Sequence, residues 1–225
     1  MKVFAVIPAF NEAARIKDTI LGVSQFVPNI VVVDDGSADQ TADIAKAVGV
    51  VVLRHAVNRG QGAALKTGTV AALELGAEAV IHVDADGQHD PESLPVLLGP
   101  LEKREADIVF GSRFLGLSAD GMPAGRRWLL ALARGFNAYA LGIPRRVTDP
   151  QSGLRAMSAA AARGLNFEQD RMAHCSEILR LATRNGWRWQ EVPTRIRYTA
   201  DSLAKGQKPW DALRIVWQLF IGAFR

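Results

Sequence analysis

In the first half of the chain, short runs of β-branched and other apolar residues alternate with segments of helical spacing. Strands are expected over Val3–Ile7, Ile30–Val33, Val50–Leu53, Ala79–Val83 and Ile108–Phe110. Helices are expected over Glu12–Val23, Thr41–Val48, Ala63–Leu75 and Pro91–Lys103. The strand runs are continuously apolar, which indicates that both faces of the sheet are covered. This order predicts an α/β fold with a mainly parallel, doubly wound sheet, helices on both faces and right-handed crossovers.

The second half of the chain is less regular. Helical spacing recurs over Arg126–Leu141, Cys175–Asn185 and Trp210–Phe224, and a Gly-rich loop covers Gly116–Gly125. Two short strands, Trp187–Val192 and Thr194–Tyr198, are separated by Pro193. Since neither a linker nor an internal repeat divides the 225 residues, we expect a single domain over 1–225.

The cysteine content and the apolar runs favour a protein of the cytoplasm. Cys175 is the single cysteine, which excludes an internal disulfide and a zinc site built from several thiolates. The apolar start that ends at Pro8 is too short for a signal peptide, and no run of 18 apolar residues is present to span a membrane.

Charge is distributed unevenly between the two halves. Residues 1–112 hold nine basic and fifteen acidic residues, a net charge of −6, whereas residues 113–225 hold eighteen and eight, a net charge of +10. An acidic half suits metal binding, and a basic half suits phosphates, anionic lipid or nucleic acid. A nucleic-acid reader is disfavoured because the basic half contains no recognised reading module. An ordinary scatter of surface charge is the alternative.

Two carboxylates, Asp84 and Asp86, follow the fourth expected strand directly. At the carboxyl end of a parallel strand, where ligands bind in open sheets, such a pair calls for a cation. Oxygen ligands select a hard ion such as Mg²⁺ or Mn²⁺, which in turn binds phosphates. Taken alone, an Asp-x-Asp sequence also fits a polar loop.

The first two expected strands also end in polar residues. Asn11 and Glu12 follow the first strand, where capping of the next helix would explain them as well as a ligand site would. Asp34 and Asp35 follow the second strand, where an acidic residue can hold a ribose hydroxyl or a base N–H.

The glycine-rich segment from Asn58 to Lys66 narrows the enzyme class. It lacks the spacing of a phosphate-binding P-loop, and no Gly-x-Gly-x-x-Gly follows the first strand, so P-loop NTPases are excluded and dinucleotide dehydrogenases are disfavoured. Gly60 and Gly62 would still allow a ligand to approach the backbone at a helix N-terminus. An ordinary loop-to-helix turn is the alternative.

Several of these motifs occur together in a defined order. They are Val6-Ile7-Pro8-Ala9-Phe10-Asn11-Glu12, Asp34-Asp35-Gly36-Ser37, Asn58-Arg59-Gly60-Gln61-Gly62, Asp84-Ala85-Asp86-Gly87-Gln88-His89, Gly111-Ser112-Arg113, Asp149-Pro150-Gln151-Ser152-Gly153-Leu154-Arg155 and Glu191-Val192-Pro193. In that order they resemble the family 2 glycosyltransferases of GT-A fold, in the branch of the dolichyl-phosphate mannosyltransferases and other polyprenyl-phosphate glycosyltransferases. The resemblance covers most of the chain.

The resemblance implies a nucleotide-sugar donor, GDP- or UDP-linked, and Mg²⁺ or Mn²⁺ as the cofactor. The residues implied for donor binding are Pro8, Phe10, Glu12, Asp35, Asp84, Ala85, Asp86, Arg113, Arg197 and Lys205. Asp86 and Gln88, with Asp84 beside them, would hold the metal, which stabilises the leaving nucleoside diphosphate. The loop around Lys205 departs from the Gly-rich form of the mannosyltransferases, which puts mannose in doubt as the donor sugar.

For catalysis, the resemblance implies inversion of the anomeric centre by direct displacement. Asp86, Arg113 and Asp149 are the implied catalytic residues, with Arg113 on a phosphate and Asp149 as the base for the acceptor. Alternatively, Asp149 orients Arg155 or the metal ligands, since a phosphate acceptor is already ionised. A pair of His174 and Glu177 on a helix surface is expected rather than an active-site wall.

The acceptor implied by this branch is a polyprenyl phosphate at a membrane surface. Segments 126–134 and 210–225 place Trp and Arg beside aliphatic residues, as interfacial helices do, although core-facing helices would also explain them. The enzyme is therefore expected as a peripheral protein at the cytoplasmic membrane face. A soluble saccharide acceptor and a non-catalytic nucleotide-binding module are the alternatives, and the oligomeric state is left open.

Overall fold

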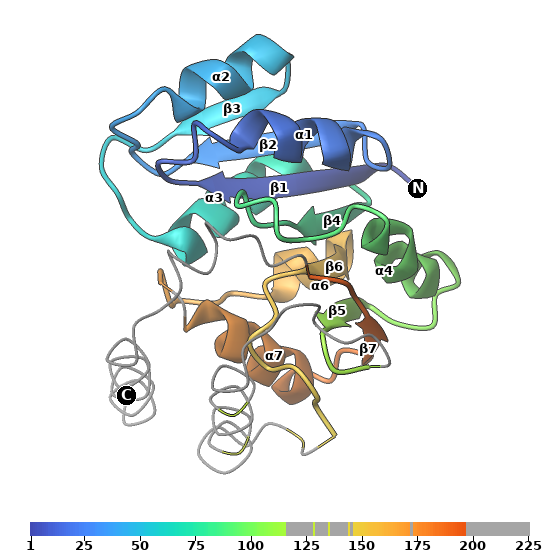
Figure 1. Ribbon diagram of the computed structural model, residues 1–225. Coiled ribbons are helices and arrows are strands. Elements are labelled where there is room, and N and C mark those ends of the chain that lie inside the picture. The colour runs from blue at the N-terminus through green and yellow to red at the C-terminus, as the bar shows by residue number, and fades with distance from the viewer. Residues whose placement is uncertain (116–127, 129–134, 136–143, 145, 172, 197–225) are drawn as a thin grey trace.

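The computed structural model describes residues 1–115, 128, 135, 144, 146–171 and 173–196, which Figure 1 draws in colour. Its strands are β1 Val3–Ala9, β2 Asn29–Asp34, β3 Val51–Arg54, β4 Ala79–His82, β5 Ile108–Ser112, β6 Arg155–Ser158 and β7 Trp189–Pro193. Its helices are α1 Ile16–Ser24, α2 Thr41–Val48, α3 Gln61–Glu74, α4 Ser93–Glu102, α6 Ala159–Gly164 and α7 His174–Arg184. The expected α/β fold is confirmed.

One sheet holds all seven of these strands, in the order β3-β2-β1-β4-β6-β5-β7 (Figure 1). From β1 the chain winds outward through β2 to β3, and α3 then returns it to β4 on the other side of β1. The strand order therefore reverses between β1 and β4. In open α/β sheets the crevice at such a switch point, outside the carboxyl ends of the strands, is where ligands bind.

The sheet differs from the expected pattern at β6, which lies between β4 and β5 and is antiparallel to both. The remaining neighbours, β1 with β2 and β4, β2 with β3, and β5 with β7, are parallel as expected. The sequence of β6, Arg-Ala-Met-Ser, contains no β-branched residue and begins with a charged one. Its central position in the sheet, rather than its own propensity, makes it a strand.

Each face of the sheet carries its own apolar core. Along β1, Ala5 and Ile7 face the cluster that includes α1 and α4, whereas Phe4 and Val6 face the cluster that includes α3 and α7. This explains why the strand runs are continuously apolar. β3 is the exception, because it lies at one edge and its residues are half-buried or exposed.

Several expected boundaries need correction. α1 begins at Ile16 and not at Glu12, because Asn11 has a φ of 54° and its side chain accepts from Ala38 N instead of capping the helix. Beyond β7, Ile196 forms an isolated bridge with His89 in place of the start of a second strand. The rest of the expected strand to Tyr198, segment 210–225 and all of segment 126–141 except Trp128 and Gly135 lie outside the described residues.

No helix within the described part of the chain is both long enough and apolar enough to span a membrane.

Candidate functional site

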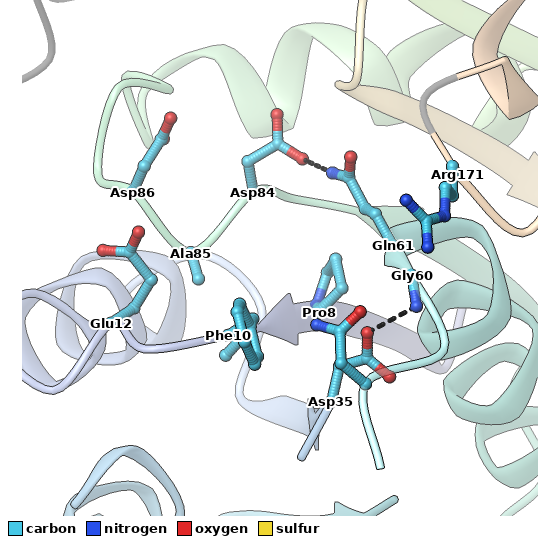
Figure 2. A pocket seen from close by; sticks show the side chains of 12 residues that line it. Pro8, Phe10, Glu12, Asp35, Gly60, Gln61, Asp84, Ala85, Asp86 and Arg171 are labelled. Atoms are coloured by element: carbon cyan, nitrogen blue, oxygen red, sulfur yellow. Dashed lines mark hydrogen bonds between the residues drawn. The ribbon is translucent and has the colours of Figure 1, made fainter. Parts of the chain in front are cut away.

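A pocket of about 480 Å³ opens at the switch point, at the carboxyl ends of β1, β2 and β4 (Figure 2). It is lined by Pro8, Ala9, Phe10, Glu12, Asp35, Asn58, Gly60, Gln61, Asp84, Ala85, Asp86 and Arg171. The structure thus brings together residues from three strand ends, from the first turn of α3 and from the segment before α7. Seven of the residues expected to bind the donor lie here: Pro8, Phe10, Glu12, Asp35, Asp84, Ala85 and Asp86.

At one end of the pocket, Asp35 is buried and its carboxylate organises the loop that follows β3. It accepts hydrogen bonds from Arg59 N at 3.0 Å, from Gly60 N at 2.7 Å and from His55 Nδ1 at 2.6 Å. Figure 2 shows this carboxylate below the turn at Gly60. Asp35 therefore fixes the wall of the pocket as well as lining it.

Phe10 and Glu12 form the rim contributed by the loop after β1. The Phe10 ring is 45% exposed, which is unusual for a phenylalanine and leaves its face available to a flat ligand. Glu12 is anchored by its backbone N, which donates to Thr41 Oγ1 at 2.8 Å, and its carboxylate pairs with Arg15 at 3.2 Å.

Asp84 sits in the middle of the pocket with its carboxylate held from both sides. Gln61 Nε2 donates to Oδ1 at 2.6 Å, as Figure 2 shows, and His89 Nε2 lies 3.0 Å from Oδ2. Burial alone would raise the pKa of Asp84, but the His89 hydrogen bond and the charges of His89, Arg155 and His174 outweigh it and lower the pKa to about 2. Asp84 is therefore ionised at neutral pH.

The pKa of Asp86 is shifted in the opposite direction. Burial and the negative charge of Asp84 raise its pKa, and the hydrogen bond from Gln88 N to its Oδ1, at 3.0 Å, only partly offsets them. The backbone of Gln88 thus supports Asp86, and Gln88 does not line the pocket. The charge of His89 also lowers the pKa of Asp86 but does not restore its ordinary value, so a bound cation would further stabilise the ionised carboxylate.

Asp84 and Asp86 could hold a divalent ion only together with oxygen atoms from a bound ligand. Among the residues that the structure describes, no group of three or more His, Cys, Asp and Glu side chains is arranged to hold a metal. Asp86, with Asp84 nearby, would therefore supply part of the coordination of Mg²⁺ or Mn²⁺. Phosphate oxygens and water would complete it, as is common for Mg²⁺ sites.

Arg113 and Asp149 lie apart from the pocket lining and bind one another. Arg113 Nε donates to Asp149 Oδ2 at 2.6 Å and Nη2 donates to Oδ1, a bidentate pair in which the Asp149 side chain is 1% exposed. Glu191 of β7 holds the Asp149 turn, accepting from Thr148 N at 2.7 Å and Asp149 N at 2.8 Å. The expectation that Asp149 orients Arg155 is wrong, because its carboxylate is bound to Arg113.

Arg155 instead lies in a buried polar layer behind Asp84. It is fully buried, donates from Nε to Gly153 O at 3.2 Å, and places Nη2 3.4 Å from Cys175 Sγ. His174 is also fully buried, with Nε2 3.5 Å from the same sulfur. Burial opposes ionisation of the Cys175 thiol, but the charges of His174 and Arg155 lower its pKa to about 7. His174 is therefore not part of a helix-surface pair.

Gly60 and Gly62, at the start of α3, have a different role from the one expected. Gly62 N donates to Asp170 O at 2.8 Å, and a methyl group added at Gly60 or Gly62 would overlap the backbone of Gln169 and Asp170. The close approach that these glycines permit is thus to segment 168–171 of the same chain, and a carbonyl group already occupies the N-terminus of α3. The same segment places Arg171 in the lining of the pocket.

Sequence reasoning missed five residues of the site: Ala9, Asn58, Gln61, His89 and Arg171. The first four lie within motifs quoted above, so their place in those motifs could have identified them. Arg171 lies in no motif, and only the fold brings it to the pocket. Arg197 and Lys205 lie outside the described residues.

Comparisons with known proteins agree with this geometry. The family model described as glycosyl transferase family 2 matches residues 4–157. A UDP-N-acetylglucosamine–dolichyl-phosphate N-acetylglucosaminyltransferase from Methanococcus voltae is 32% identical over 240 residues, covering 97% of this chain and 95% of that protein. An undecaprenyl-phosphate mannosyltransferase from Micrococcus luteus is 33% identical over 176 residues, covering 75% and 71%.

Among solved structures, glucosyl-3-phosphoglycerate synthase from Mycobacterium tuberculosis superposes with a TM-score of 0.74 at 25% identity, over 99% of this chain and 79% of that one. That enzyme was crystallised with Mn²⁺, UDP and glucosyl-3-phosphoglycerate. The likeness confirms the GT-A fold. Because the family model matches well over half of the sequence and includes the strand ends that line the pocket, this chain belongs to glycosyl transferase family 2 and is a glycosyltransferase.

Proposed function

We propose that this enzyme transfers a sugar from a nucleoside diphosphate sugar to a polyprenyl phosphate. The transfer inverts the anomeric centre and requires bound Mg²⁺ or Mn²⁺. The observation that carries the proposal is the division of the pocket. In Figure 2, Phe10 and Asp35 lie on the lower side of the pocket, suited to a base and ribose, and the carboxylates of Asp84 and Asp86 lie on the upper side, suited to a metal-bound diphosphate.

Each part of the site has a separable task. The Phe10 ring would stack on the nucleobase, and Asp35, held by the Gly60 turn, would accept a hydrogen bond from the ribose or base. Asp84, ionised and locked by Gln61 and His89, would orient the donor by accepting from its hydroxyl groups. Asp86 would hold the metal, which supplies Lewis-acid stabilisation to the departing diphosphate.

The acceptor side needs little base catalysis if the acceptor is a phosphate monoester. The second pKa of such a group is about 6, so it is largely ionised at neutral pH and can attack directly. Asp149, which is already bound to Arg113, would then serve to fix that guanidinium near the acceptor rather than to remove a proton. Arg197 and Lys205 remain candidates for further phosphate contacts.

The names of the two relatives support a polyprenyl-phosphate acceptor, since each acts on a lipid phosphate. A second candidate is a small soluble phosphate, because the solved neighbour makes glucosyl-3-phosphoglycerate. Both acceptors carry a phosphate, so the same arginines could serve either. A membrane-bound acceptor would also account for the net charge of +10 in residues 113–225, which would favour an anionic surface and a peripheral location.

Donor and acceptor can be tested separately. Titration calorimetry with UDP and with GDP, each with Mn²⁺ and with EDTA, should give tight binding for one base and only with the metal. Phe10→Ala should weaken binding of the nucleoside alone by about tenfold, the usual order for one stacked base. Phe26→Ala, which removes an aromatic ring 39% exposed but outside this pocket, is the matched control and should bind normally.

For the acceptor, UDP-N-acetylglucosamine and GDP-mannose would be offered with polyprenyl phosphate in anionic vesicles or with 3-phosphoglycerate in solution. Mass spectrometry should detect a polyprenyl phosphosugar, and NMR of its anomeric proton should show inversion. Turnover with 3-phosphoglycerate alone, together with no flotation on vesicles, would favour the soluble acceptor. Binding of neither nucleotide under any of these conditions would sink the proposal.

A further inference from the structure

The pocket is unbalanced in charge. Its lining includes four carboxylates, Glu12, Asp35, Asp84 and Asp86, and within the described residues Arg171 is the one cation among them. A nucleotide-sugar adds at least two further negative charges. Arg113 does not line the pocket, and its guanidinium is paired with Asp149. Positive charge for the donor must therefore come from a bound ion and from another basic side chain.

Arg171 is held at the pocket by a segment that is fixed along its length. At the start of the segment, the carboxylate of Glu177 accepts from Glu168 N at 3.0 Å and from Gln169 N at 2.8 Å. Since both donors are backbone groups, this single side chain sets the path of the segment. Phe167, just before it, is buried in the core that includes α7.

In the middle of the segment, Asp170 is attached to the first turn of α3. Its carbonyl accepts from Gly62 N at 2.8 Å, and its side chain pairs with Lys66 at 3.1 Å. Any side chain at Gly60 or Gly62 would overlap this part of the segment. Residues 169–170 therefore pack directly against the backbone at Gly60–Gly62.

The backbone of Arg171 is held by His174 at the start of α7. Its carbonyl accepts from His174 N at 3.1 Å and lies 2.8 Å from Nδ1 of the fully buried His174 ring. With its backbone held, the exposed side chain lies along the pocket wall, where Figure 2 shows its guanidinium beside Gln61 and Gly60. Gln61 in turn donates to Asp84. No salt bridge joins Arg171 to a carboxylate within the described ranges.

We propose that Arg171 binds an anionic group of the donor, either the diphosphate or a carboxylate on the transferred sugar. The 168–171 segment, which packs against Gly60–Gly62, positions Arg171 for this contact. The inference rests on the proposed function, because it assumes a nucleotide-sugar in this pocket. A planar guanidinium suits both candidate groups, since each offers two oxygens to its paired N–H donors.

The test compares Arg171→Met with Arg180→Met in the full chain with Mn²⁺ present. Arg180 is exposed on α7 and is not part of the pocket lining, so its loss removes the same charge elsewhere. Calorimetry would use uridine, UDP, UDP-glucose and UDP-glucuronate, or guanosine, GDP, GDP-mannose and GDP-mannuronate if the wild type prefers guanine. Arg171→Met should bind the nucleoside diphosphate about 10- to 100-fold more weakly than the wild type and should bind the nucleoside normally. Arg171→Lys, which keeps the positive charge, should lose less affinity than Arg171→Met.

The other ligands identify the anionic group. Weaker binding of UDP itself points to the diphosphate, whereas a loss confined to UDP-glucuronate points to a sugar carboxylate. Gly62→Ala should reproduce the loss seen in Arg171→Met by displacing the segment. The inference about Arg171 is overturned, with the proposed function left standing, if Arg171→Met binds all four ligands like the wild type. The same holds if its affinity for the nucleoside falls as much as its affinity for the diphosphate. A wild type that binds no nucleoside diphosphate overturns the proposed function as well.

Discussion

The guanidinium of Arg113 and the carboxylate of Asp149 form a bidentate pair, with 12% and 1% of their side chains exposed. A pair this buried contributes through mutual neutralisation, so removing one partner leaves an unpaired buried charge. Neither residue lines the nucleotide pocket. The pair connects the end of β5 to the turn that Glu191 holds from β7, so it braces the part of the sheet formed by β5 and β7.

Asp149→Asn and Arg113→Met should each lower the free energy of unfolding by about 3 kcal/mol, the usual cost of breaking a buried pair. The double variant should lose less than the sum of the two, because neither charge is then left unpaired. Urea unfolding of the three proteins measures this coupling. Arg188→Met breaks the exposed pair with Asp107 and serves as the control, for which a much smaller loss is expected. Additive losses in the cycle would contradict the pairing.

Asp86→Asn should have opposite effects on stability and on binding. In EDTA the variant should unfold at a higher temperature than the wild type, because the repulsion between Asp84 and Asp86 and the cost of burying the Asp86 charge are both removed. With Mn²⁺ and a nucleoside diphosphate, the wild type should gain stability and the variant should not. Thermal unfolding under the four conditions measures both effects. Equal stabilisation of the two proteins by Mn²⁺ and nucleotide would remove Asp86 from the metal site.

Gly153→Ala should lower activity while leaving the fold intact. The added methyl group would crowd the Asp84 carboxylate and shift it away from Gln61 and His89. A displacement of about 1 Å in a catalytic site can cost roughly 100-fold in rate. Gly99→Ala in α4, where an added methyl meets nothing within 4 Å apart from its chain neighbours, is the control and should keep wild-type activity, although Pro100 directly after it disfavours a Cβ in helical conformation and should lower stability slightly. Sugar-transfer rates and urea unfolding of both variants test the pair, and wild-type activity in Gly153→Ala would contradict the role given to Asp84.

The Asp107–Arg188 pair at the sheet edge predicts a pH dependence. The hydrogen bond from Arg188 lowers the pKa of Asp107 in the folded protein. A carboxylate with a depressed folded pKa contributes stability above its unfolded pKa of about 3.9, and loses it as the pH falls through the folded value. Wild type and Arg188→Met should therefore differ in stability at pH 7 and converge below pH 3, as measured by urea unfolding. A difference that persists at pH 2.5 would assign the effect to packing by the arginine stem.

The first half of the chain was predicted well from sequence because the information there is local. Each strand run of the first half is apolar, and each ends in residues whose chemistry depends on that position, so Asp35, Asp84 and Asp86 could be assigned to one edge of the sheet. The helix starts were less well predicted. At Asn11 a positive φ and long-range hydrogen bonds to Ser37 and Ala38 delay the first helix, and no propensity rule anticipates those contacts.

The second half of the chain resisted prediction because its structure depends on distant partners. β6 has little strand propensity and is a strand because β4 and β5 lie on either side of it. His174 was expected in a pair on a helix surface, but it is fully buried behind Asp84, as Arg155 is. Likewise Arg171 reaches the pocket only through the contacts of residues 168–170 with α3 and α7.

The position of β6 also constrains how the chain can fold during synthesis. β1 to β4 join through short crossovers, and their pairing is complete once residue 82 has emerged. β4 then remains an open edge until Arg155–Ser158 is made, some seventy residues later, and β5 waits longer still for β7. Pairing over such separations is slow and leaves unpaired strand edges exposed. The β1–β4 part of the sheet can thus form early on the ribosome, whereas a nascent chain stalled before β6 would present an open β4 edge to its neighbours.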